Sequence, residues 1–417
     1  MAVFFSATVC LMHVVVEAQQ AAAPVTVFEG ARLIVGDGSA AIEDSAFVVQ
    51  NGRFTTVGRK GQLKVPAGAA RVDLTGKTVM PALIDAHKHL AVTRDALVDQ
   101  LQHLAYYGIG TTMSLGQDTG DEVYKVRAEI IPNAARYRTA GRGLTGPEPG
   151  RSQAPYWVTT VAEARKYVDE DVAKKVDIIK LWVDDRDHTV TKLSPELYGV
   201  AIAEAHRHNL RTIAHIFTLE DAKGMLRAGI DNFAHSVRDK DVDDEYIRLI
   251  KAKPGFIVDP NLPDRGVRVD RSWLRDTMTA AEFQKVQADS KDDPKEQQFF
   301  GIQCRNLTRV NKDGIKVALG SDGGIPWRAH EQIADMAGCG MTPAEVIVAS
   351  TRNAAALIGI TDTGSIAARK TADFLVLDAN PLDDITNTRR INAVYLRGAQ
   401  VDRVGLRARW TSATSSR

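Results

Sequence analysis

Strand patterns and helix patterns alternate through the middle of the chain. Between about Pro81 and Gly359, helical spacing separates eight apolar runs: LIDAHKHL, TTMSLG, ARYRTAG, DIIKLWVDD, RTIAHIF, NFAHSV, FIVDPNL and VALGSD. Ser194-Pro195-Glu196 and Thr342-Pro343-Ala344-Glu345 combine a capping residue with a first-turn proline, which indicates helix starts. Eight alternating units over about 280 residues predict an α/β fold, a (β/α)8 TIM barrel. A doubly wound open sheet is the alternative.

The two ends of the chain carry a different pattern. From Val25 to Val79, short β runs are broken by glycine and aspartate, and Asn51-Gly52 between two runs predicts a hairpin. ADFLVLDANPL and INAVYLRGAQV near the other end have the same character. We therefore predict a small β-sandwich built from residues 24–79 and 361–410, with the barrel at residues 80–360.

Residues 1–23 are predicted to be a secretory signal peptide. An apolar run from Val3 to Val16 leads into Val16-Glu17-Ala18, which offers small residues for cleavage before Gln19. No lysine or arginine precedes the run, so only the amino terminus supplies positive charge. We expect a periplasmic or secreted protein, with a cytoplasmic one as the alternative. No later segment is a long uninterrupted apolar run, so no membrane association is expected after signal removal.

Composition and charge narrow the possible partners. Lys+Arg number 53 against Asp+Glu 52, a formal net charge of +1, which gives no support for nucleic acid as a partner. Hydrophobic residues make up 44% of the 417 residues, so the chain can bury a large core and is not disordered. Cys10, Cys304 and Cys339 are too few for a thiolate metal site. Only Cys304 and Cys339 are candidates for a disulfide, and the sequence leaves their state open.

Metal-binding residue types follow several of the predicted strands. His87 and His89 stand at i and i+2, so they point to the same face of a strand. His215, His235 and Asp322 each follow another apolar run. Each of them alone is more often a hydrogen-bonded or capping residue. Their coincidence at strand ends, where catalytic groups of barrels collect, favours a site for zinc or a similar ion.

Lys180 stands inside the apolar strand DIIKLW. A bare ammonium is costly there unless it is paired or neutralised. The residues alone favour a salt bridge to a nearby carboxylate such as Asp184. An ammonium has no acceptor, so it cannot itself bind a metal ion.

The motifs PALIDAHKHL, IIKLWVDD, IAHIF, NFAHSV and ALGSDGG resemble, in this order, those of the amidohydrolase superfamily with two metal ions. The tail GSIAARKTADFLVLDANPLDDI resembles the closing β piece of that family. The resemblance covers about Val25 to Val401. It is greatest to the imidazolonepropionase-like group, which includes Xaa-Pro dipeptidases and ochratoxin-hydrolysing amidases.

This resemblance implies a site for two divalent ions, expected to be zinc. His87 and His89 would hold the more buried ion, and His215 and His235 the second. Asp322 would bind the first ion and transfer protons.

The resemblance also implies that Lys180 is carboxylated and bridges both ions. A carbamate is an anion with two acceptor oxygens, so it removes the difficulty of a buried ammonium. Lys180 also argues against a deaminase, which usually holds one metal and lacks this bridge.

The function implied is metal-dependent hydrolysis of an amide, as in a dipeptide, an Xaa-Pro unit or an N-acyl amino acid such as an ochratoxin-like amide. Metal-activated hydroxide attacks the carbonyl, and Asp322 passes the proton to the leaving amine. A lactonase or a carbamate or ester hydrolase would use the same site. A non-catalytic barrel scaffold is the alternative from another class.

The substrate pocket is less defined by the sequence. Tyr137, Arg138 and Arg142 follow the third strand and His188 the fourth, so they are candidates for binding a carboxylate or an oxyanion. Surface charge in a loop explains them equally well. Lys88, between the two histidines, is expected to face away from the metals in an ion pair. We expect a small-molecule substrate and a homo-oligomer.

Overall fold

A computed structural model describes residues 25–412, and parallel strands form its centre. The larger sheet contains, in spatial order, β11 (Tyr156–Trp157), β10 (Leu144–Thr145), β12 (Ile179–Val183), β13 (Thr212–Ile216), β14 (Asn232–Ala234), β15 (Ile257–Asp259) and β16 (Lys316–Val317). The smaller sheet contains β7 (Leu83–Lys88), β8 (Ile109–Ser114) and β9 (Arg136–Thr139). These elements include all eight runs that the alternating pattern predicted as strands.

Backbone hydrogen bonds join the two parallel sheets at two places. On one side, Ala86 N donates to Leu319 O at 2.9 Å and Asp322 N donates to His87 O at 2.9 Å. On the other side, Asp177 N donates to the carbonyl of the last β9 residue at 2.9 Å. The arrangement is TIM-barrel-like, in agreement with the expected fold class.

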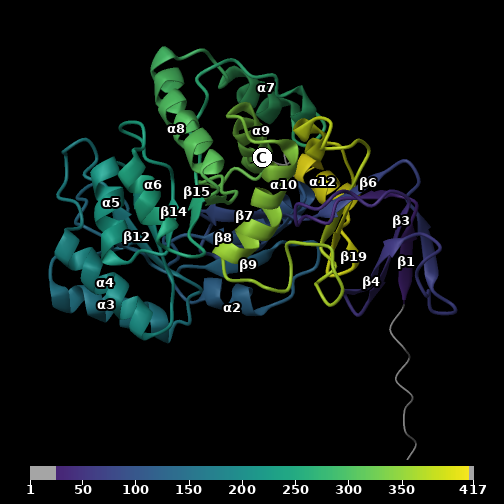
Figure 1. Cartoon of the computed structure of the whole chain (residues 1–417), viewed down its shortest axis with the longest axis horizontal. Helices are drawn as coiled ribbons and strands as arrows, with labels where there is room; N and C mark the ends of the chain where they lie inside the picture. Colours follow the sequence, from purple (N-terminus) through teal and green to yellow (C-terminus); the bar gives the residue numbers. More distant parts are fainter. Residues whose placement is uncertain (1–24, 413–417) are drawn as a thin grey trace, which may run out of the picture.

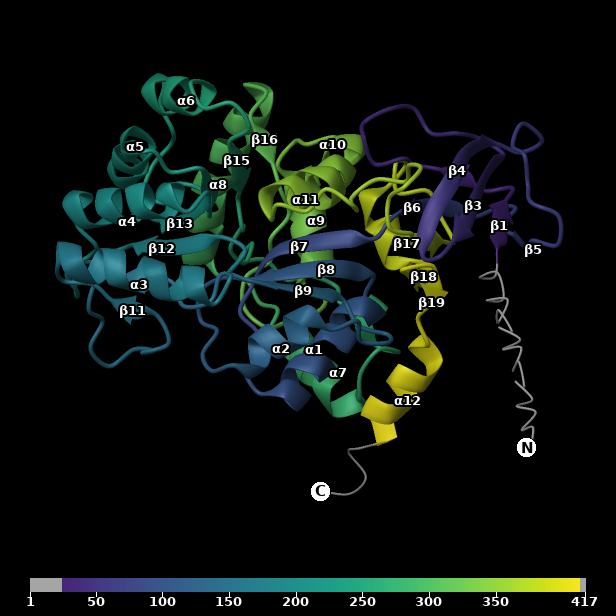
Figure 2. The ribbon, with the colours of Figure 1, turned by 90° about the horizontal axis from the view of Figure 1, so that it is seen from below.

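Helices surround the parallel strands (Figure 1). They are α1 (Arg94–Tyr106), α2 (Glu122–Ala128), α3 (Val161–Ala173), α4 (Pro195–Arg207), α5 (Leu219–Ala228), α6 (Asp244–Lys251), α7 (Ala280–Ala288), α8 (Pro294–Lys312), α9 (Arg328–Gly338), α10 (Pro343–Val348), α11 (Ala354–Leu357) and α12 (Arg403–Ser412). Figure 2 shows α1 and α2 against β7, β8 and β9. Within residues 25–412, no helix combines the length and apolar character needed to cross a membrane.

The two helix starts expected from capping residues are confirmed. At α4, the Ser194 side chain accepts a hydrogen bond from Leu197 N, and a proline occupies the first turn. At α10, Thr342 and Glu345 form a reciprocal capping box, again with a proline in the first turn. These bonds satisfy amide groups that have no partner inside the helix.

The chain ends form two further sheets that lie together at one end of the molecule (Figure 1). One contains β4 (Arg53–Arg59), β3 (Ser45–Gln50), β1 (Thr26–Glu29) and β5 (Ala70–Asp73). The other contains β19 (Ala399–Gln400), β18 (Ile391–Leu396), β17 (Phe374–Leu377), β6 (Thr78–Pro81) and β2 (Arg32–Leu33). Antiparallel pairing of β17 with β6 therefore joins the C-terminal piece to the N-terminal one.

An aromatic cluster fills the space shared by these terminal sheets. The rings of Phe28 and Phe47 stack with centroids 5.1 Å apart, and Phe374 meets Phe28 edge-on at 5.1 Å. The predicted hairpin between β3 and β4 is confirmed, with Asn51 at φ 52° and Gly52 at φ 70°. Positive φ at both central residues is what a two-residue hairpin turn requires.

The fold does not test the predicted signal peptide or the predicted domain limits. The predicted signal peptide, residues 1–23, lies outside the described residues. The domain limits at residues 24–79, 80–360 and 361–410 stay a prediction. Helix α12 lies at the end of the predicted segment 361–410, but it packs against helix α1. The rings of Trp410 and His103 stack at this contact.

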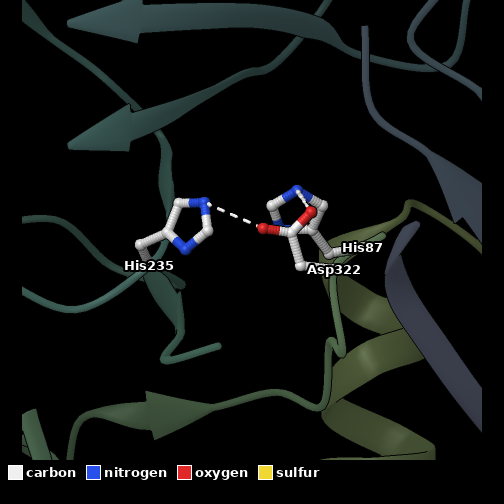
Figure 3. Close-up of side chains that lie close together, drawn as sticks. All are labelled: His87, His235 and Asp322. Carbon is white, nitrogen blue, oxygen red and sulfur yellow. Dashed lines mark ion pairs between the residues drawn. The ribbon is translucent and has the colours of Figure 1, made fainter. Parts of the chain in front are cut away.

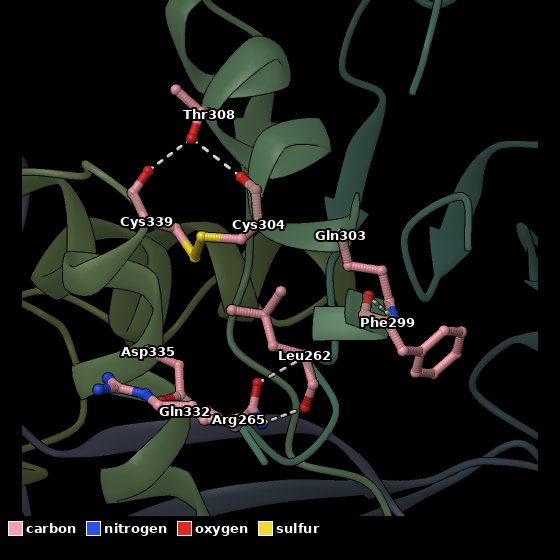
Figure 4. Close-up of a disulfide and its surroundings, with 9 residues drawn as sticks. All are labelled: Leu262, Arg265, Phe299, Gln303, Cys304, Thr308, Gln332, Asp335 and Cys339. Carbon is pink, nitrogen blue, oxygen red and sulfur yellow. Dashed lines mark hydrogen bonds and ion pairs between the residues drawn. A yellow bond between two sulfur atoms is a disulfide. The ribbon is translucent and has the colours of Figure 1, made fainter. Parts of the chain in front are cut away.

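A disulfide links Cys304 in α8 to Cys339, the residue after α9 (Figure 4). The Thr308 hydroxyl lies 2.9 Å from the carbonyl oxygen of Cys304 and 2.6 Å from that of Cys339. The bond closes a segment with a sequence separation of 35 residues. Such a cross-link stabilises the folded chain, on the chain-entropy account, by restricting the unfolded state.

We predict that His330 in α9 makes stability depend on pH. The ring is buried, its Nε2 donates to Tyr107 O at 2.9 Å, and burial lowers the pKa of His330 to about 4. The unfolded chain has a histidine pKa of about 6.5, so it binds more protons as the pH falls below that value, and the folded state loses stability.

Between pH 7 and pH 5 this histidine should therefore remove about 2 kcal/mol of unfolding free energy. Chemical denaturation of the parent and of His330→Gln at both pH values measures the effect. The parent should lose about 2 kcal/mol more than the variant over this range. Equal losses would show that His330 has an ordinary pKa.

Candidate metal centre

The strand register brings the expected histidines to one level of the larger sheet. Trp182 pairs with His215, and His215 pairs with Ala234, the residue before His235. Because neighbouring parallel strands end at the same edge, the two histidine rings meet, with centroids 4.4 Å apart. Both side chains are buried.

His87, His89 and Asp322 complete the cluster where β16 and its following loop meet β7. The Asp322 carboxylate lies 3.1 Å from His89 Nε2 and 3.7 Å from His87 Nε2. Its other oxygen lies 3.9 Å from His235 Nε2 (Figure 3). The ligand atoms of His87, His235 and Asp322 are all within 4.8 Å of one another. These distances suit side chains that share a metal ion.

Lys88 fixes the loop that carries Asp322. Its fully buried ammonium donates to Ser321 Oγ at 3.0 Å and to Ile325 O at 2.8 Å. Asp85 lies 4.0 Å from the same nitrogen and accepts a hydrogen bond from Ser321 Oγ at 2.6 Å. Lys88 therefore acts in an ion pair behind the site, as expected, and it holds Asp322 at the mouth.

Burial sets the protonation of the histidines. It lowers the pKa of His215 to about 3 and lowers the pKa of His87 and His235 well below the usual histidine value. These rings are therefore neutral at neutral pH, and each keeps a nitrogen lone pair. A neutral imidazole is the form that binds zinc.

Asp322 is ionised in the same cluster. Burial opposes its charge, but the contacts with His87 and His89 and the hydrogen bond from Gly323 N outweigh that effect and hold the pKa of Asp322 well below its usual value. Its side chain is 43% exposed, so it faces the open mouth of the site. An ionised and partly exposed carboxylate can both bind a cation and receive a proton.

Lys180 is buried without a hydrogen-bond partner for its Nζ among the residues that the structure describes. The salt bridge to Asp184 favoured by the residues alone is wrong. The Asp184 carboxylate instead lies 2.7 Å from Arg186 Nη1 and 2.9 Å from His215 Nε2. Burial lowers the pKa of Lys180 to about 7, so a large fraction of the amine is neutral at neutral pH.

The residues present fit a metal centre. Among the described residues, His87 Nε2 is buried without a hydrogen-bond partner, as is the Lys180 amine. Buried polar atoms without partners are rare in folded proteins, and an absent ion is one of their ordinary explanations. The donor set of four imidazoles and one carboxylate is also one that zinc prefers.

Asp259 is a site residue that the sequence analysis missed. It ends β15 with its carboxylate fully buried, 3.5 Å from His87 Nδ1. Burial raises the pKa of Asp259 well above its usual value. Asn261 Nδ2 lies 2.6 Å from the same ring nitrogen of His87. The signal was present, because Asp259 follows the apolar run Phe256-Ile257-Val258 as the other site residues follow theirs.

Two of the predicted substrate-binding residues are engaged inside the fold. Tyr137 donates from its hydroxyl to the buried Asp118 carboxylate at 2.8 Å. Arg138 forms an ion pair with Asp177 at 2.8 Å. A role for either side chain in binding substrate stays a prediction.

The other two predicted substrate-binding residues lie in loops. The Arg142 guanidinium lies over the Tyr156 ring, 4.0 Å from its centroid, and donates to Ala154 O at 2.5 Å. The His188 side chain is 92% exposed and pairs with Asp185 at 3.0 Å. Their roles also stay predictions.

Comparison with known proteins identifies the family. The sequence signature of the Amidohydrolase family matches residues 78–401. The chain belongs to this family. Membership makes it a hydrolase that acts on carbon–nitrogen bonds. An imidazolonepropionase of Deinococcus radiodurans is 25% identical over 395 residues, which cover 86% of this chain and 92% of that protein.

Solved structures of other family members share the fold. A putative prolidase from Bifidobacterium longum superposes with a TM-score of 0.75 at 24% identity, over 93% of this chain and 99% of that one. The ochratoxinase of A. niger gives a TM-score of 0.70 at 20% identity, over 91% of this chain and 96% of that one. The resemblance to an amidohydrolase stated from the motifs is therefore confirmed.

Gly320 allows the Asp259 carboxylate to lie against His87 in the candidate metal centre. A Cβ at Gly320 would overlap the Asp259 carboxylate. We predict that Gly320→Ala lowers the free energy of unfolding by about 1–3 kcal/mol, because the buried carboxylate must move. The variant should also bind zinc more weakly, since Asp259 lies against His87.

Gly199 in α4 supplies the control, because nothing lies within 4 Å of a Cβ at that position. Gly199→Ala should stabilise the chain by about 0.5–1 kcal/mol, as alanine does inside a helix. Chemical denaturation and zinc titration measure both variants. A Gly320→Ala protein with parental stability and zinc affinity would contradict this account.

Proposed function

We propose that this chain is a metal-dependent amidohydrolase that cleaves the amide bond of a dipeptide, an Xaa-Pro unit or an N-acyl amino acid such as an ochratoxin-like amide. The observation that carries the proposal is the convergence of four histidines and Asp322 around the unpartnered Lys180 amine. The names of two similar structures, a putative prolidase and an ochratoxinase, support the choice of substrate class.

Two divalent ions, expected to be zinc, fit this set of donors. His87, His89 and Asp322 would hold one ion, and His215 and His235 the other. When bound, such ions polarise a carbonyl and lower the pKa of a water molecule to near neutrality. Asp184 accepts from His215 Nε2 at 2.9 Å, which orients that ring and leaves its Nδ1 for the ion.

We propose that Lys180 is carboxylated. Its lowered pKa leaves a neutral amine whose lone pair attacks carbon dioxide, forming a nitrogen–carbon bond and releasing one proton. The resulting carbamate has two oxygens to place between the ions. Carboxylation would thus convert a buried amine without a hydrogen-bond partner into an anion that lies beside neutral imidazoles.

Asp322 is proposed to carry the proton. The carboxylate is ionised, hydrogen-bonded by His89 and open to the mouth of the site. It takes the proton of the attacking water and returns it to the leaving nitrogen. Because an amine anion is a poor leaving group, an amide requires this second transfer.

The closure of the barrel and the arrangement of the terminal sheets are also part of the proposal. We infer that the parallel strands close into an eight-stranded barrel, supported by the backbone hydrogen bonds at both joins between the sheets. We also infer that the two terminal sheets form a β-sandwich over the cluster of Phe28, Phe47 and Phe374. Assembly as a homo-oligomer stays a prediction.

The function is tested through the metal and Lys180 together. Strong chelation should abolish amide hydrolysis, and zinc, manganese or cobalt should restore it. Lys180→Ala and Lys180→Arg should each lower kcat/KM at least about a hundredfold, because neither side chain can bridge two ions. Millimolar short carboxylic acids should partly restore Lys180→Ala by occupying the bridge.

Lys223 offers a matched control, since it is a buried lysine whose ammonium lies 3.0 Å from Glu245 in an ordinary ion pair. Lys223→Arg should keep parental metal content and activity. Full activity in metal-free protein, or in Lys180→Arg, would refute the proposed function. If the protein hydrolysed lactones or esters but no amide, the proposed metal site would stand and the proposed substrate class would be wrong.

We also propose that the protein is exported. Disulfides persist in oxidising compartments, and the pairing of Cys304 with Cys339 supports such a location. The proposal agrees with the apolar segment expected to serve as a signal.

Expression of the whole chain in a Gram-negative host tests the export. The mature protein should begin near Gln19, which removes Cys10, and thiol titration without reductant should find no free thiol. An intact Met1 on cytosolic protein with free cysteines would place the protein in the cytoplasm.

A further inference from the structure

The two ring nitrogens of His87 face different surroundings. Nε2 faces the Asp322 carboxylate at 3.7 Å (Figure 3) and is buried without a hydrogen-bond partner among residues 25–412. Nδ1 instead faces Asn261, whose Nδ2 lies 2.6 Å away, and the Asp259 carboxylate, 3.5 Å away. The neighbours of Nδ1 therefore decide which of the two nitrogens carries the proton of the neutral ring.

Asn261 is held in a backbone conformation that is uncommon for any residue other than glycine. Its φ is 45°, in the left-handed region, which asparagine enters more readily than most side chains. The following residue is fixed by Gln332, which donates to Leu262 O at 2.6 Å and accepts from Leu262 N at 2.9 Å. Asn261 is only 4% exposed, so its amide is enclosed beside the His87 ring. Uncommon backbone conformations of this kind cluster at functional sites, where they preorganise a group.

Asn261 is the neighbour of Nδ1 that lies at hydrogen-bonding distance. Bonds of the N–H···O kind have a length of about 2.7–3.2 Å, and the Asp259 carboxylate at 3.5 Å lies beyond that range. The amide also lies nearer to His87 than to His235, whose Nδ1 is 3.4 Å from Asn261 Nδ2. The proton position on His87 therefore depends on Asn261 before any other side chain.

The amide of Asn261 offers a donor and an acceptor of nearly the same shape. When Nδ2 donates to His87 Nδ1, the ring proton must be on Nε2, which then has no lone pair for a metal ion. A half-turn of the amide exchanges its two atoms, so that Oδ1 accepts from Nδ1–H and Nε2 keeps its lone pair. Oδ1 is buried without a hydrogen-bond partner in the described part of the chain, so it has no competing bond to lose.

We propose that Asn261 is a positioning residue of the metal centre, whose amide oxygen accepts the Nδ1–H of His87 and so keeps Nε2 open to a metal ion. The inference rests on the proposed function and deepens it. A ligand histidine whose other nitrogen donates to a fixed acceptor is held in one orientation and one tautomer. The turned amide fits the other tautomer in the metal-free protein, whereas an ionised aspartate at this position would fit only one of the two.

The position of the ring proton tests this assignment directly. Long-range proton–nitrogen correlation spectra of histidine-labelled protein distinguish the two tautomers, and the spectrum of His87→Ala identifies the signals of His87. In the zinc-loaded parent, the proton should be on Nδ1. In zinc-loaded Asn261→Gly, this proton should exchange with solvent about tenfold faster or more, because its acceptor is gone. A zinc-loaded parent with the proton of His87 on Nε2 would overturn the assignment.

Zinc titration measures the same effect without turnover. Asn261→Gly removes the amide and keeps the backbone conformation, because glycine adopts positive φ at no steric cost. We expect zinc affinity to fall about 10–100-fold, as is usual when the partner of a ligand histidine is removed. In a His87→Ala background, Asn261→Gly should change the affinity for the remaining ion by less than about twofold, since the amide acts through His87. The same loss in both backgrounds would show that Asn261 acts in another way.

Asn209 supplies the matched control, because it is an exposed asparagine with a φ of 57° that lies just after α4. Asn209→Gly should keep the parental zinc affinity. Parental affinity in Asn261→Gly would overturn this inference and leave the proposed function standing. A parent that binds no zinc would refute the metal centre, and the role of Asn261 with it.

Discussion

The burial of one lysine amine is the constraint on which the site depends. Lys180 lies inside β12 with no hydrogen-bond partner for its nitrogen in the part of the chain that the structure describes. An isolated ammonium in such a place is unfavourable, and burial shifts the amine toward its neutral form. The charges of Asp322 and Asp259 favour the ammonium, but burial outweighs them. Asp184 does not relieve it either, because Asp184 is held by Arg186 and His215. The proposed carbamate between two ions resolves this conflict.

The elements around Lys180 hold its surroundings rigid. Lys88, Asp85 and Ser321 fix the loop of Asp322 from behind. Trp182 is held in place by Gly116 and Gly143, where a Cβ would overlap its ring, and it lies over the His89 ring with centroids 6.3 Å apart.

Much of this arrangement was predictable from the sequence. The eight alternating runs identified the strands, because a buried parallel strand is a short apolar run. A polar residue directly after such a run must lie at the common end of the strands, so His215, His235 and Asp322 could be grouped. The proline-containing helix starts followed from capping chemistry alone.

The rest required contacts between distant segments. A salt bridge from Lys180 to Asp184 was a reasonable expectation, but Asp184 is engaged by Arg186 and by His215, which lies on the next strand of the sheet. Asp259 was missed because an aspartate before proline is typical of a turn.

The number of divalent ions bound to each chain tests the central claim most directly. Elemental analysis of protein purified without chelator and dialysed against zinc provides it. We predict about two ions per chain in the parent and loss of both ions in Lys180→Ala. A chain that binds none under these conditions and still hydrolyses amides would contradict it.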